Sequence, residues 1–317
     1  MSDAPVTSQA VRPMRTVLAV PGHRWRMLES AAASAADAVF IDLEDAVPPD
    51  EKSAALRSAI RALGELDWGA KHVAVRVNVD ASGVLESEVV ALAGDAARLD
   101  AILVPKVECT AVLAQTEALL DEHSGANPPL QIEALIETAR GIVNVDMIAA
   151  AGGRLAALHF GVGDFSASIG ARNVDVGGTH AGYAVTRRDE IGNYVTAPLD
   201  LWGYPMMRML VAARAFDLRA IDGPCGAFRD PVLTRSLALK AAAMGFDGKQ
   251  VIHPEQIAAT RAAFIPSDEE IRAAEATLDA MAQAEAAGLA AVSVNGRMVD
   301  YANVRMAQRL LAMAERG

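Results

Sequence analysis

The stretch Gln131-Ile-Glu-Ala-Leu-Ile-Glu-Thr-Ala-Arg-Gly141 contains the pattern that decides the fold. Its short apolar run is typical of a buried strand, ends at the acidic residue Glu137, and leads into a segment that could be helical. The same unit recurs along the chain. The predicted strands cover residues 16–20, 38–42, 72–76, 101–104, 131–136, 155–160, 218–222 and 248–252.

The count and order of these units predict the architecture. Segments with helical character follow the strands, among them 24–36, 51–66, 204–216 and 231–244. Eight strand-then-helix units in succession favour a closed parallel (β/α)8 barrel over an open doubly wound sheet. The connection 166–203 after the sixth strand is long. Loops of this length are usually functional lids or disordered, and this one is expected on the active, C-terminal face of the barrel.

The two ends of the chain are expected to lie outside the barrel. Residues 1–13 are polar, contain proline and lack the apolar centre of a secretory signal, so we expect a flexible arm. The barrel is assigned to 14–265, and 266–317 to a C-terminal helical extension. Ser267 and Glu270 have capping-box spacing, which predicts a helix to about residue 287. After a break at 288–296 a final helix is predicted over 298–315. The amphipathic faces of both helices must pack on their own barrel or on a neighbouring subunit.

Composition narrows the class of protein. The chain has 317 residues, 52% of them hydrophobic, a net charge of −11 and a pI near 5.1. This acidic balance argues against nucleic-acid binding, and we find no apolar stretch long enough to span a membrane. Only two cysteines, Cys109 and Cys225, occur in a chain of this size, which favours free thiols in a reducing, cytoplasmic compartment.

A second acidic residue, Asp164 in Phe160-Gly-Val-Gly-Asp-Phe165, also ends an apolar run. Two carboxylates at neighbouring strand ends can hold one hard cation, and oxygen-only ligation suits Mg²⁺, which leaves positions for water or substrate oxygens. The pair Glu137 and Asp164 therefore predicts a metal-dependent enzyme. The alternative is that Glu137 caps a helix beginning at Thr138 and that Asp164 merely begins the long loop.

Polar residues follow other predicted strands as well. Because strand C-termini carry the chemistry of barrel enzymes, these residues predict an acidic, cation-binding mouth with one prominent arginine. Strand two ends in Asp42-Leu-Glu-Asp45, strand three in Arg76-Val-Asn78, strand four in Pro105-Lys-Val-Glu108 and strand seven in Asp222-Gly-Pro224.

Seven motifs, in order along nearly the whole chain, resemble the signature of the HpcH/HpaI aldolase and citrate lyase β-subunit-like family. The segment 159–168, the long loop after it, Ile221-Asp-Gly-Pro224 and the C-terminal extension look more like malyl-CoA or β-methylmalyl-CoA lyases than like the shorter citrate lyase subunits. The seven motifs are Val20-Pro-Gly22, Asp42-Leu-Glu-Asp-Ala46 with Asp50-Glu-Lys52, Val75-Arg-Val-Asn78, Val104-Pro-Lys-Val-Glu108, Ile136-Glu-Thr-Ala-Arg-Gly141, Phe160-Gly-Val-Gly-Asp164 and Ile252-His-Pro254.

The resemblance implies a Mg²⁺-dependent homotrimer or homohexamer that cleaves or forms the carbon–carbon bond of a 3-hydroxyacyl-CoA. Because the proposed site offers only hard oxygen ligands, Mn²⁺ is expected to substitute for Mg²⁺. It makes Glu137 and Asp164 the metal ligands. It makes Arg76 the residue that binds substrate oxygens and stabilises the enolate. The alternative for Arg76 is a salt bridge to Glu44 or Asp45. Those two acids are expected to orient metal-bound water or Arg76, without touching the metal themselves.

The remaining assignments also rest on the resemblance or on charge. Lys106 is either a residue of the site, in a supporting role like that of Glu44 and Asp45, or a plain strand-end charge. Asp300 matches the family's general base, contributed from an adjacent subunit, and its alternative role is an ordinary helix N-cap. Arg24 and, more weakly, Arg26 and Lys52 are candidates for binding the phosphates of coenzyme A.

Other motifs give little evidence of function. His180 and His253 have no second histidine at ligand spacing, which favours structural or supporting roles. The pair Gly161 and Gly163 does not complete a dinucleotide fingerprint. Cys225 lies beside Asp222-Gly-Pro224 and has no nucleophile context.

The resemblance therefore implies reversible cleavage of (S)-malyl-CoA into acetyl-CoA and the oxo acid glyoxylate. Four alternatives use the same site: citramalyl-CoA lyase, β-methylmalyl-CoA lyase, malyl-CoA thioesterase and a citryl lyase of the citrate lyase β-subunit type. A non-catalytic binding or assembly subunit is the alternative from another class.

Overall fold

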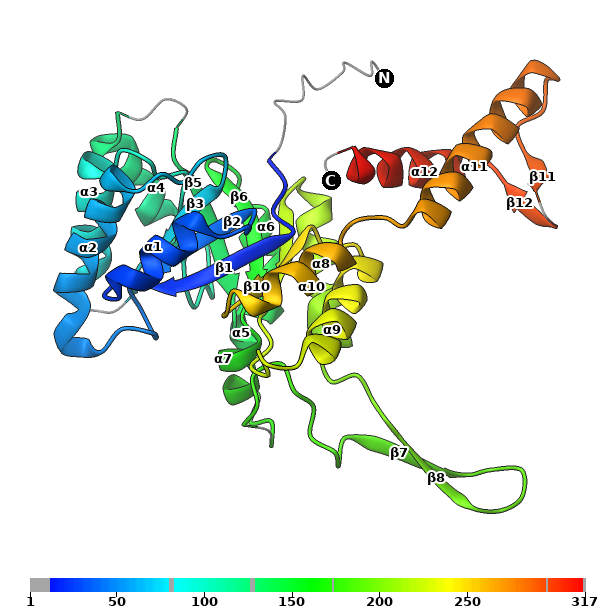
Figure 1. Ribbon diagram of the computed structural model, residues 1–317, viewed down its shortest axis with the longest axis horizontal. Coiled ribbons are helices and arrows are strands. Elements are labelled where there is room, and N and C mark those ends of the chain that lie inside the picture. The colour runs from blue at the N-terminus through cyan, green and yellow to red at the C-terminus, as the bar shows by residue number, and fades with distance from the viewer. Residues whose placement is uncertain (1–11, 80–82, 126–128, 173, 295, 316–317) are drawn as a thin grey trace. The chain divides into compact units, whose positions relative to one another are not determined.

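The computed structural model describes residues 12–79, 83–125, 129–172, 174–294 and 296–315 (Figure 1). It forms two compact units, Met1–Thr260 and Arg261–Gly317. Most of the predicted N-terminal arm, residues 1–11, lies outside the described residues.

The first unit is a closed barrel of parallel strands in the order β1-β10-β9-β6-β5-β4-β3-β2, with helices between them, so the predicted (β/α)8 fold is confirmed. Each predicted strand agrees with the observed one to within one residue at either end. The barrel strands are β1 Thr16–Pro21, β2 Ala38–Asp42, β3 His72–Arg76, β4 Ala101–Val104, β5 Gln131–Ile136, β6 Leu155–Phe160, β9 Arg219–Asp222 and β10 Gly248–Val251.

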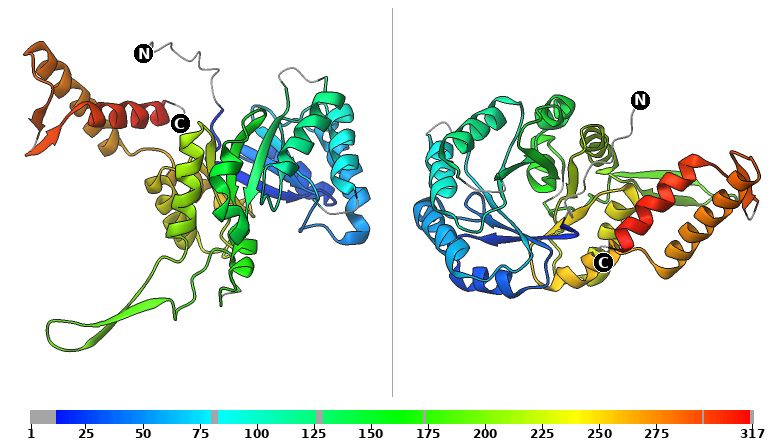
Figure 2. Two further views of the ribbon diagram at one scale, coloured as in Figure 1. Left: turned by 180° about the vertical axis from the view of Figure 1, so that it is seen from behind. Right: turned by 90° about the horizontal axis from the view of Figure 1, so that it is seen from above.

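Seen from above, the helices surround the strands of this unit (Figure 2). The helices are α1 Trp25–Ala33, α2 Lys52–Glu65, α3 Val84–Asp95, α4 Ala111–His123, α5 Ala139–Val143, α6 Val145–Ala149, α7 Val162–Ser168, α8 Gly203–Ala215, α9 Pro231–Met244 and α10 Glu255–Ala263, with a short 3-10 turn η1 Pro49–Glu51 before α2.

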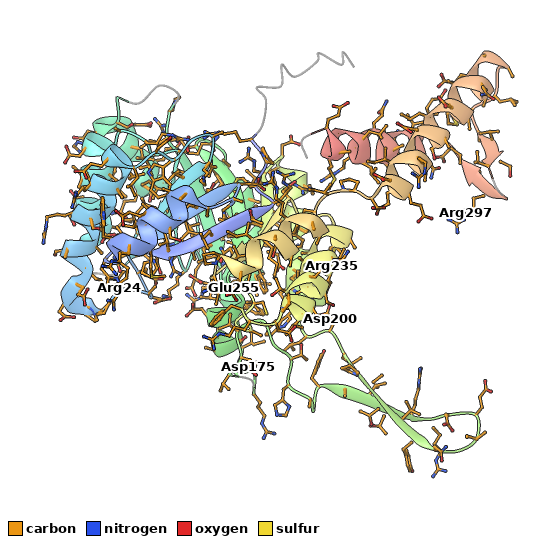
Figure 3. All side chains as sticks on the ribbon, in the orientation of Figure 1. Arg24, Asp175, Asp200, Arg235, Glu255 and Arg297 are labelled. Carbon is orange, nitrogen blue, oxygen red and sulfur yellow. The ribbon has the colours of Figure 1, made fainter. Side chains whose placement is uncertain are left out.

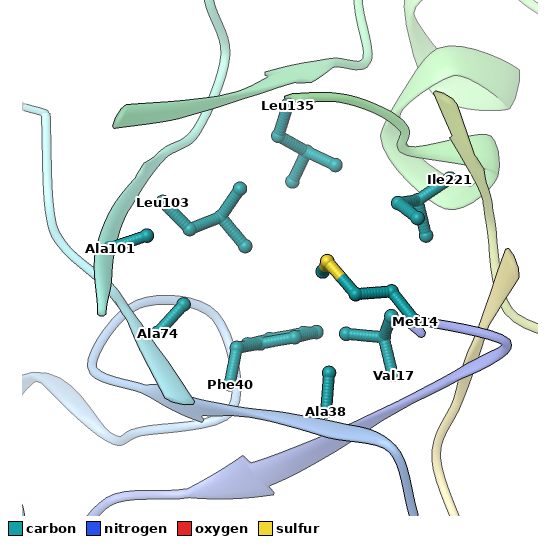
Figure 4. Packing of buried hydrophobic residues seen from close by; sticks show 9 residues of the cluster. All are labelled: Met14, Val17, Ala38, Phe40, Ala74, Ala101, Leu103, Leu135 and Ile221. Atoms are coloured by element: carbon teal, nitrogen blue, oxygen red, sulfur yellow. The ribbon is translucent and has the colours of Figure 1, made fainter. Parts of the chain in front are cut away.

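Nearly continuous burial of the strands explains why they form a barrel covered on both faces. All five residues of β2 and all four of β4 are buried, as expected for parallel strands that have helices outside and a packed interior. Alternate residues point inward and meet in one apolar cluster (Figure 4). Its members are Met14, Val17, Ala38, Phe40, Ala74, Ala101, Leu103, Leu135 and Ile221.

The long connection after the sixth barrel strand contains regular structure, which was not predicted from the sequence. Residues 162–168 form α7, although glycines and serines favour helices poorly, because Phe165 packs against Phe160 and Trp202 with ring centroids 5.4 and 6.5 Å apart. The hairpin β7 Ala184–Arg188 and β8 Tyr194–Pro198 follows (Figure 1). Its signal in the sequence is Gly192 between two β-prone runs. In the structure this glycine adopts a left-handed φ in the turn.

The second unit contains two helices joined by a small hairpin. The predicted capping box of Ser267 and Glu270 is confirmed at the start of α11 Asp268–Ala286. The predicted break contains strand β11 Val292–Val294, which pairs with β12 Arg297–Val299. The last helix, α12 Tyr301–Ala314, begins three residues later than predicted, because Asp300 caps it together with Asn303.

No helix within the described residues is both long and apolar enough to cross a membrane.

Candidate active site

Glu137 directly follows β5 at the carboxyl end of the barrel strands and is 1% exposed. The backbone N–H of Lys106 donates to its Oε1 at 2.8 Å. Its carboxylate lies over Gly161, where a side chain would collide with Cβ and Oε2 of Glu137. Glu137 does not cap a helix, because Thr138 is the N-cap of α5 and accepts from Gly141 N at 3.0 Å.

Asp164 does not begin a loop, as the alternative expectation had it, but lies half-buried in the first turn of α7. It is close enough to act electrostatically on Glu137. Burial, followed by the charges of Asp164 and Glu44, raises the pKa of Glu137 to about 8, against the opposing effects of Arg76 and the Lys106 N–H. Two carboxylates that repel each other in a buried place form a site that favours a cation.

Arg76 ends β3 and is 11% exposed at its side chain. Its Nε and Nη2 donate to the two oxygens of Asp42 at 2.7 and 2.6 Å, and Nη1 lies 3.0 Å from Glu44 and 3.8 Å from Asp45. Burial alone would lower the pKa of Arg76, but the bonds to Asp42 and the charges of Glu44 and Glu137 outweigh it and raise the pKa. The salt bridges to Glu44 and Asp45 thus exist, and Asp42 is a partner that the sequence reasoning missed.

Lys106 follows β4 and joins the same cluster from the other side. Its ammonium contacts Glu44 and lies 3.3 Å from Asp45. The hydrogen bond and the charge of Glu44 outweigh burial and raise the pKa of Lys106. Burial raises the pKa of Glu44. The pKa of exposed Asp45 is lowered, because its hydrogen bond with Glu44 and the charges of Lys106 and Arg76 outweigh the effect of burial. The structure therefore brings Arg76, Lys106, Glu44 and Asp45 into one ionic network.

Lys52 does not act as a free basic group at the mouth. Its ammonium donates to the carbonyl oxygens of Leu43 at 3.2 Å and Glu44 at 3.1 Å, and also to Oδ1 of Asn78. Asn78 in turn donates through its backbone N–H and Nδ2 to buried Glu88, each at 2.7 Å. This network ties the segment that carries Glu44 to the segment that follows Arg76.

The candidate coenzyme A residues Arg24 and Arg26 are both exposed. Arg24 precedes the first residue of α1, just after the carboxyl end of β1 (Figure 3). Its side chain makes no capping hydrogen bond. Its backbone carbonyl accepts from Met27 N and Leu28 N, and its backbone N–H donates to Pro21 O.

Asp300 belongs to the second unit. Its Oδ1 accepts from Ala302 N at 2.8 Å and from Asn303 N at 3.4 Å, so the N-cap expected as its alternative role is present. Within the described residues, no group of three or more His, Cys, Asp or Glu side chains is arranged to hold a metal ion. The candidate pair Glu137 and Asp164 has two members, and water or substrate would complete the shell.

Sequence reasoning also missed a polar cluster inside the barrel. Glu133 on β5 is 1% exposed and lies 2.8 Å from Nε2 of His72 and 3.0 Å from Nε2 of His159. Nδ1 of His159 lies 3.1 Å from Nε2 of Gln250. The signal was available, since Glu133 stands at an inward position of β5, two residues before Leu135 of the apolar cluster.

Residues 15–254 match the family model described as HpcH/HpaI aldolase/citrate lyase. The chain belongs to this family. Together with its relatives that are named lyases, this makes the chain a carbon–carbon lyase. It is 38% identical over 310 residues to the L-malyl-CoA/β-methylmalyl-CoA lyase of Cereibacter sphaeroides, which covers 96% of this chain and 95% of that one. A (3S)-malyl-CoA thioesterase of the same species is 36% identical over 303 residues, again 96% and 95% of the two chains.

Solved structures of this family share the fold. CitE of Mycobacterium tuberculosis, in complex with magnesium, acetoacetate and coenzyme A, superposes with a TM-score of 0.72 at 29% identity, covering 96% of this chain and 98% of that one. The citrate lyase β-subunit from M. tuberculosis with oxaloacetate and magnesium gives a TM-score of 0.60 at 31% identity, covering 80% and 98%.

Proposed function

We propose that this lyase is a Mg²⁺-dependent enzyme that reversibly cleaves (S)-malyl-CoA to acetyl-CoA and glyoxylate. The observation that carries the proposal is the mutually repelling pair of buried Glu137 and half-buried Asp164, beside the guanidinium of Arg76 that Asp42 holds in place. The similarity to malyl-CoA lyases over 96% of the chain supports the choice of substrate.

The residues at the mouth fit a hard divalent cation. Glu137 and Asp164 supply only oxygen ligands, and the absence of a side chain at Gly161 leaves the space in which the Glu137 carboxylate sits. A cation between them would offset the repulsion that raises the pKa of Glu137. Bound Mg²⁺ supplies Lewis-acid chemistry, polarising the oxygens of the oxo acid.

Arg76 is placed to stabilise the enolate. Asp42 holds Nε and Nη2 and so fixes the plane of the guanidinium, while Nη1 faces Glu44. In the direction of bond formation, Nη1 would exchange Glu44 for the thioester oxygen. The acetyl methyl group loses a proton, the enolate carbon attacks the aldehyde carbon of glyoxylate, and the new alkoxide takes up a proton to give the 3-hydroxyacyl product.

Asp300 is the proposed base that removes the methyl proton, and in cleavage it returns that proton. We propose that it acts from a neighbouring subunit of a trimer or hexamer. Its N-cap bonds both use Oδ1, and they fix the orientation of the carboxylate. Arg24 and Arg26, exposed near the carboxyl end of β1, are the proposed partners of the coenzyme A phosphates.

Hydrolysis of the malyl thioester is the second candidate function, favoured by the 36% identity to the (3S)-malyl-CoA thioesterase. Product analysis separates the two. A lyase converts malyl-CoA to acetyl-CoA and glyoxylate, whereas a thioesterase produces malate and free coenzyme A. A non-catalytic subunit would produce neither.

The metal dependence is tested by chelation. We expect EDTA to abolish glyoxylate release from malyl-CoA and excess Mg²⁺ or Mn²⁺ to restore it, because the candidate ligands are all oxygens. Glu137→Gln and Asp164→Asn should remove Mg²⁺ binding in calorimetry while circular dichroism stays unchanged. Glu122→Gln, on the outer face of α4 and 74% exposed, is the matched control. Full turnover in metal-free enzyme would overturn the proposal.

A further inference from the structure

Lys106 adopts a backbone conformation that its side chain does not favour. Its φ is 51°, in the left-handed region, and within the described residues only one other non-glycine residue, Asp217 with φ 56°, has a positive φ. A left-handed lysine is disfavoured because Cβ crowds the backbone, and glycine or asparagine occupies such a position more easily. Strain of this kind persists where the surrounding structure requires it, often at functional sites.

The left-handed turn lets one residue reach two sides of the mouth. The backbone N–H of Lys106 donates to Oε1 of Glu137 at 2.8 Å, at the end of β5. The side chain extends toward the segment after β2, where its ammonium contacts Glu44 and lies 3.3 Å from Asp45. The next residue, Val107, already donates to Leu135 O at 3.2 Å and so returns the chain to β5.

We propose that Lys106 is a positioning residue with two separable roles. Its left-handed backbone orients Glu137 for the metal, and its ammonium holds Glu44 and Asp45 beside Arg76. This inference rests on the proposed function, since it assumes that Glu137 binds Mg²⁺. It explains why the position combines a strained backbone with a long cationic side chain: glycine would satisfy the first requirement and lose the second.

The two roles are separated by comparing Lys106→Gly with Lys106→Val. Both variants lack the ammonium, but glycine adopts a positive φ freely, whereas a β-branched residue resists it and should withdraw the N–H from Glu137. We expect Lys106→Gly to bind Mg²⁺ at least as tightly as the wild type in titration calorimetry. Lys106→Val should bind it about tenfold or more weakly, as expected for a lost hydrogen bond to a charged group. Turnover should fall in both variants.

Asp217 supplies the matched control, because it shares the left-handed conformation but lies between the end of α8 and the start of β9, away from the carboxyl ends of the strands. Asp217→Gly and Asp217→Val should differ in their urea midpoint and leave Mg²⁺ affinity unchanged. If Lys106→Val does not fold, Lys106→Ala, which disfavours a positive φ less, is compared with Lys106→Gly in its place.

The outcomes distinguish the two proposals. Equal Mg²⁺ affinity in Lys106→Gly and the non-glycine variant would overturn the backbone role, as would an equal loss in Asp217→Val. Wild-type turnover in Lys106→Gly would overturn the role of the ammonium. Absence of Mg²⁺ binding by the wild type would overturn the metal site of the proposed function, and this inference with it.

Discussion

At the scale of single residues, the orientation of the Arg76 guanidinium is fixed by its contacts with Asp42 at 2.7 and 2.6 Å and with Glu44 at 3.0 Å. Lysine carries the charge but has no planar fork, so it cannot hold both oxygens of Asp42 and still offer a donor to substrate. We predict that Arg76→Lys lowers kcat by about 10²–10³-fold, the size reported for loss of one oxyanion donor. Steady-state kinetics at saturating Mg²⁺ measures this change.

Arg208→Lys is the control for this prediction. Arg208 makes a similar bidentate salt bridge with Asp146, at 2.9 and 2.7 Å, between the outer helices α8 and α6. Its replacement should leave turnover unchanged. If Arg76→Lys also turned over at the wild-type rate with unchanged circular dichroism, Arg76 would be a structural ion pair.

At the scale of elements, strand β5 places two carboxylates in opposite electrostatic environments. Glu133 and Leu135 on β5 and Glu137 directly after it are spaced two residues apart, which places them on one face. Burial raises the pKa of Glu137 to about 8. Burial would also raise that of Glu133, but the charges and hydrogen bonds of His72 and His159 outweigh it and lower the pKa. The strand thus carries one carboxylate that histidines stabilise inside the barrel, and the residue directly after the strand is the carboxylate proposed to bind a cation at the mouth.

The lowered pKa of Glu133 predicts a pH-dependent contribution to stability. A carboxyl whose folded pKa lies below its unfolded value, 4.5, stabilises the protein above that pH, and the contribution is lost as the pH falls toward the folded pKa. We expect Glu133→Gln to lower the free energy of unfolding by about 3–5 kcal/mol near neutral pH, because it leaves a buried cluster incompletely paired. Below about pH 4 the difference from the wild type should narrow.

Urea unfolding of both proteins across this pH range measures the effect. Glu65→Gln is the control, because its pair with Arg61 is exposed and screened by solvent, so little should change. A Glu133→Gln variant as stable as the wild type at neutral pH would show that the histidines do not stabilise the carboxylate.

At the scale of the whole molecule, the proposed base Asp300 and the proposed metal ligand Glu137 belong to different compact units. If Asp300 serves a neighbouring barrel, Asp300→Asn and Glu137→Gln subunits should complement each other after mixing and exchange. Each variant is expected to be inactive alone, and random exchange should restore activity at about a quarter of the interfaces. Asparagine is also a good N-cap, so Asp300→Asn removes the charge and retains the start of α12.

Glyoxylate release by the exchanged mixture is the measurement, and exchange is verified by mass spectrometry of the intact oligomer. Each variant mixed with itself is the control. Verified hetero-oligomers without recovered activity would exclude donation between subunits. Wild-type exchange of acetyl-CoA methyl protons with solvent in Asp300→Asn would exclude this residue as the base.

The sequence by itself determined the barrel, because its signal is local and repeated. Short buried runs alternate with helical segments, and burial on both faces makes each parallel strand visible as a run of apolar residues, as in β2 and β4. The acidic residues at the ends of the strands could also be predicted from the sequence, because each one directly ends an apolar run that marks a strand. The capping box at Ser267 was readable because it depends on residues three apart.

Only the tertiary structure decided which of these charges meet. The pairing of Arg76 with Asp42 depends on the register of β2 and β3, and the position of Lys52 depends on where Asn78 and Leu43 come together. Helix α7 and the left-handed Lys106 run against local propensity and exist because packing around Phe165 and the hydrogen bond to Glu137 hold them. Contacts between residues far apart in the chain determine these features, and no local pattern encodes them.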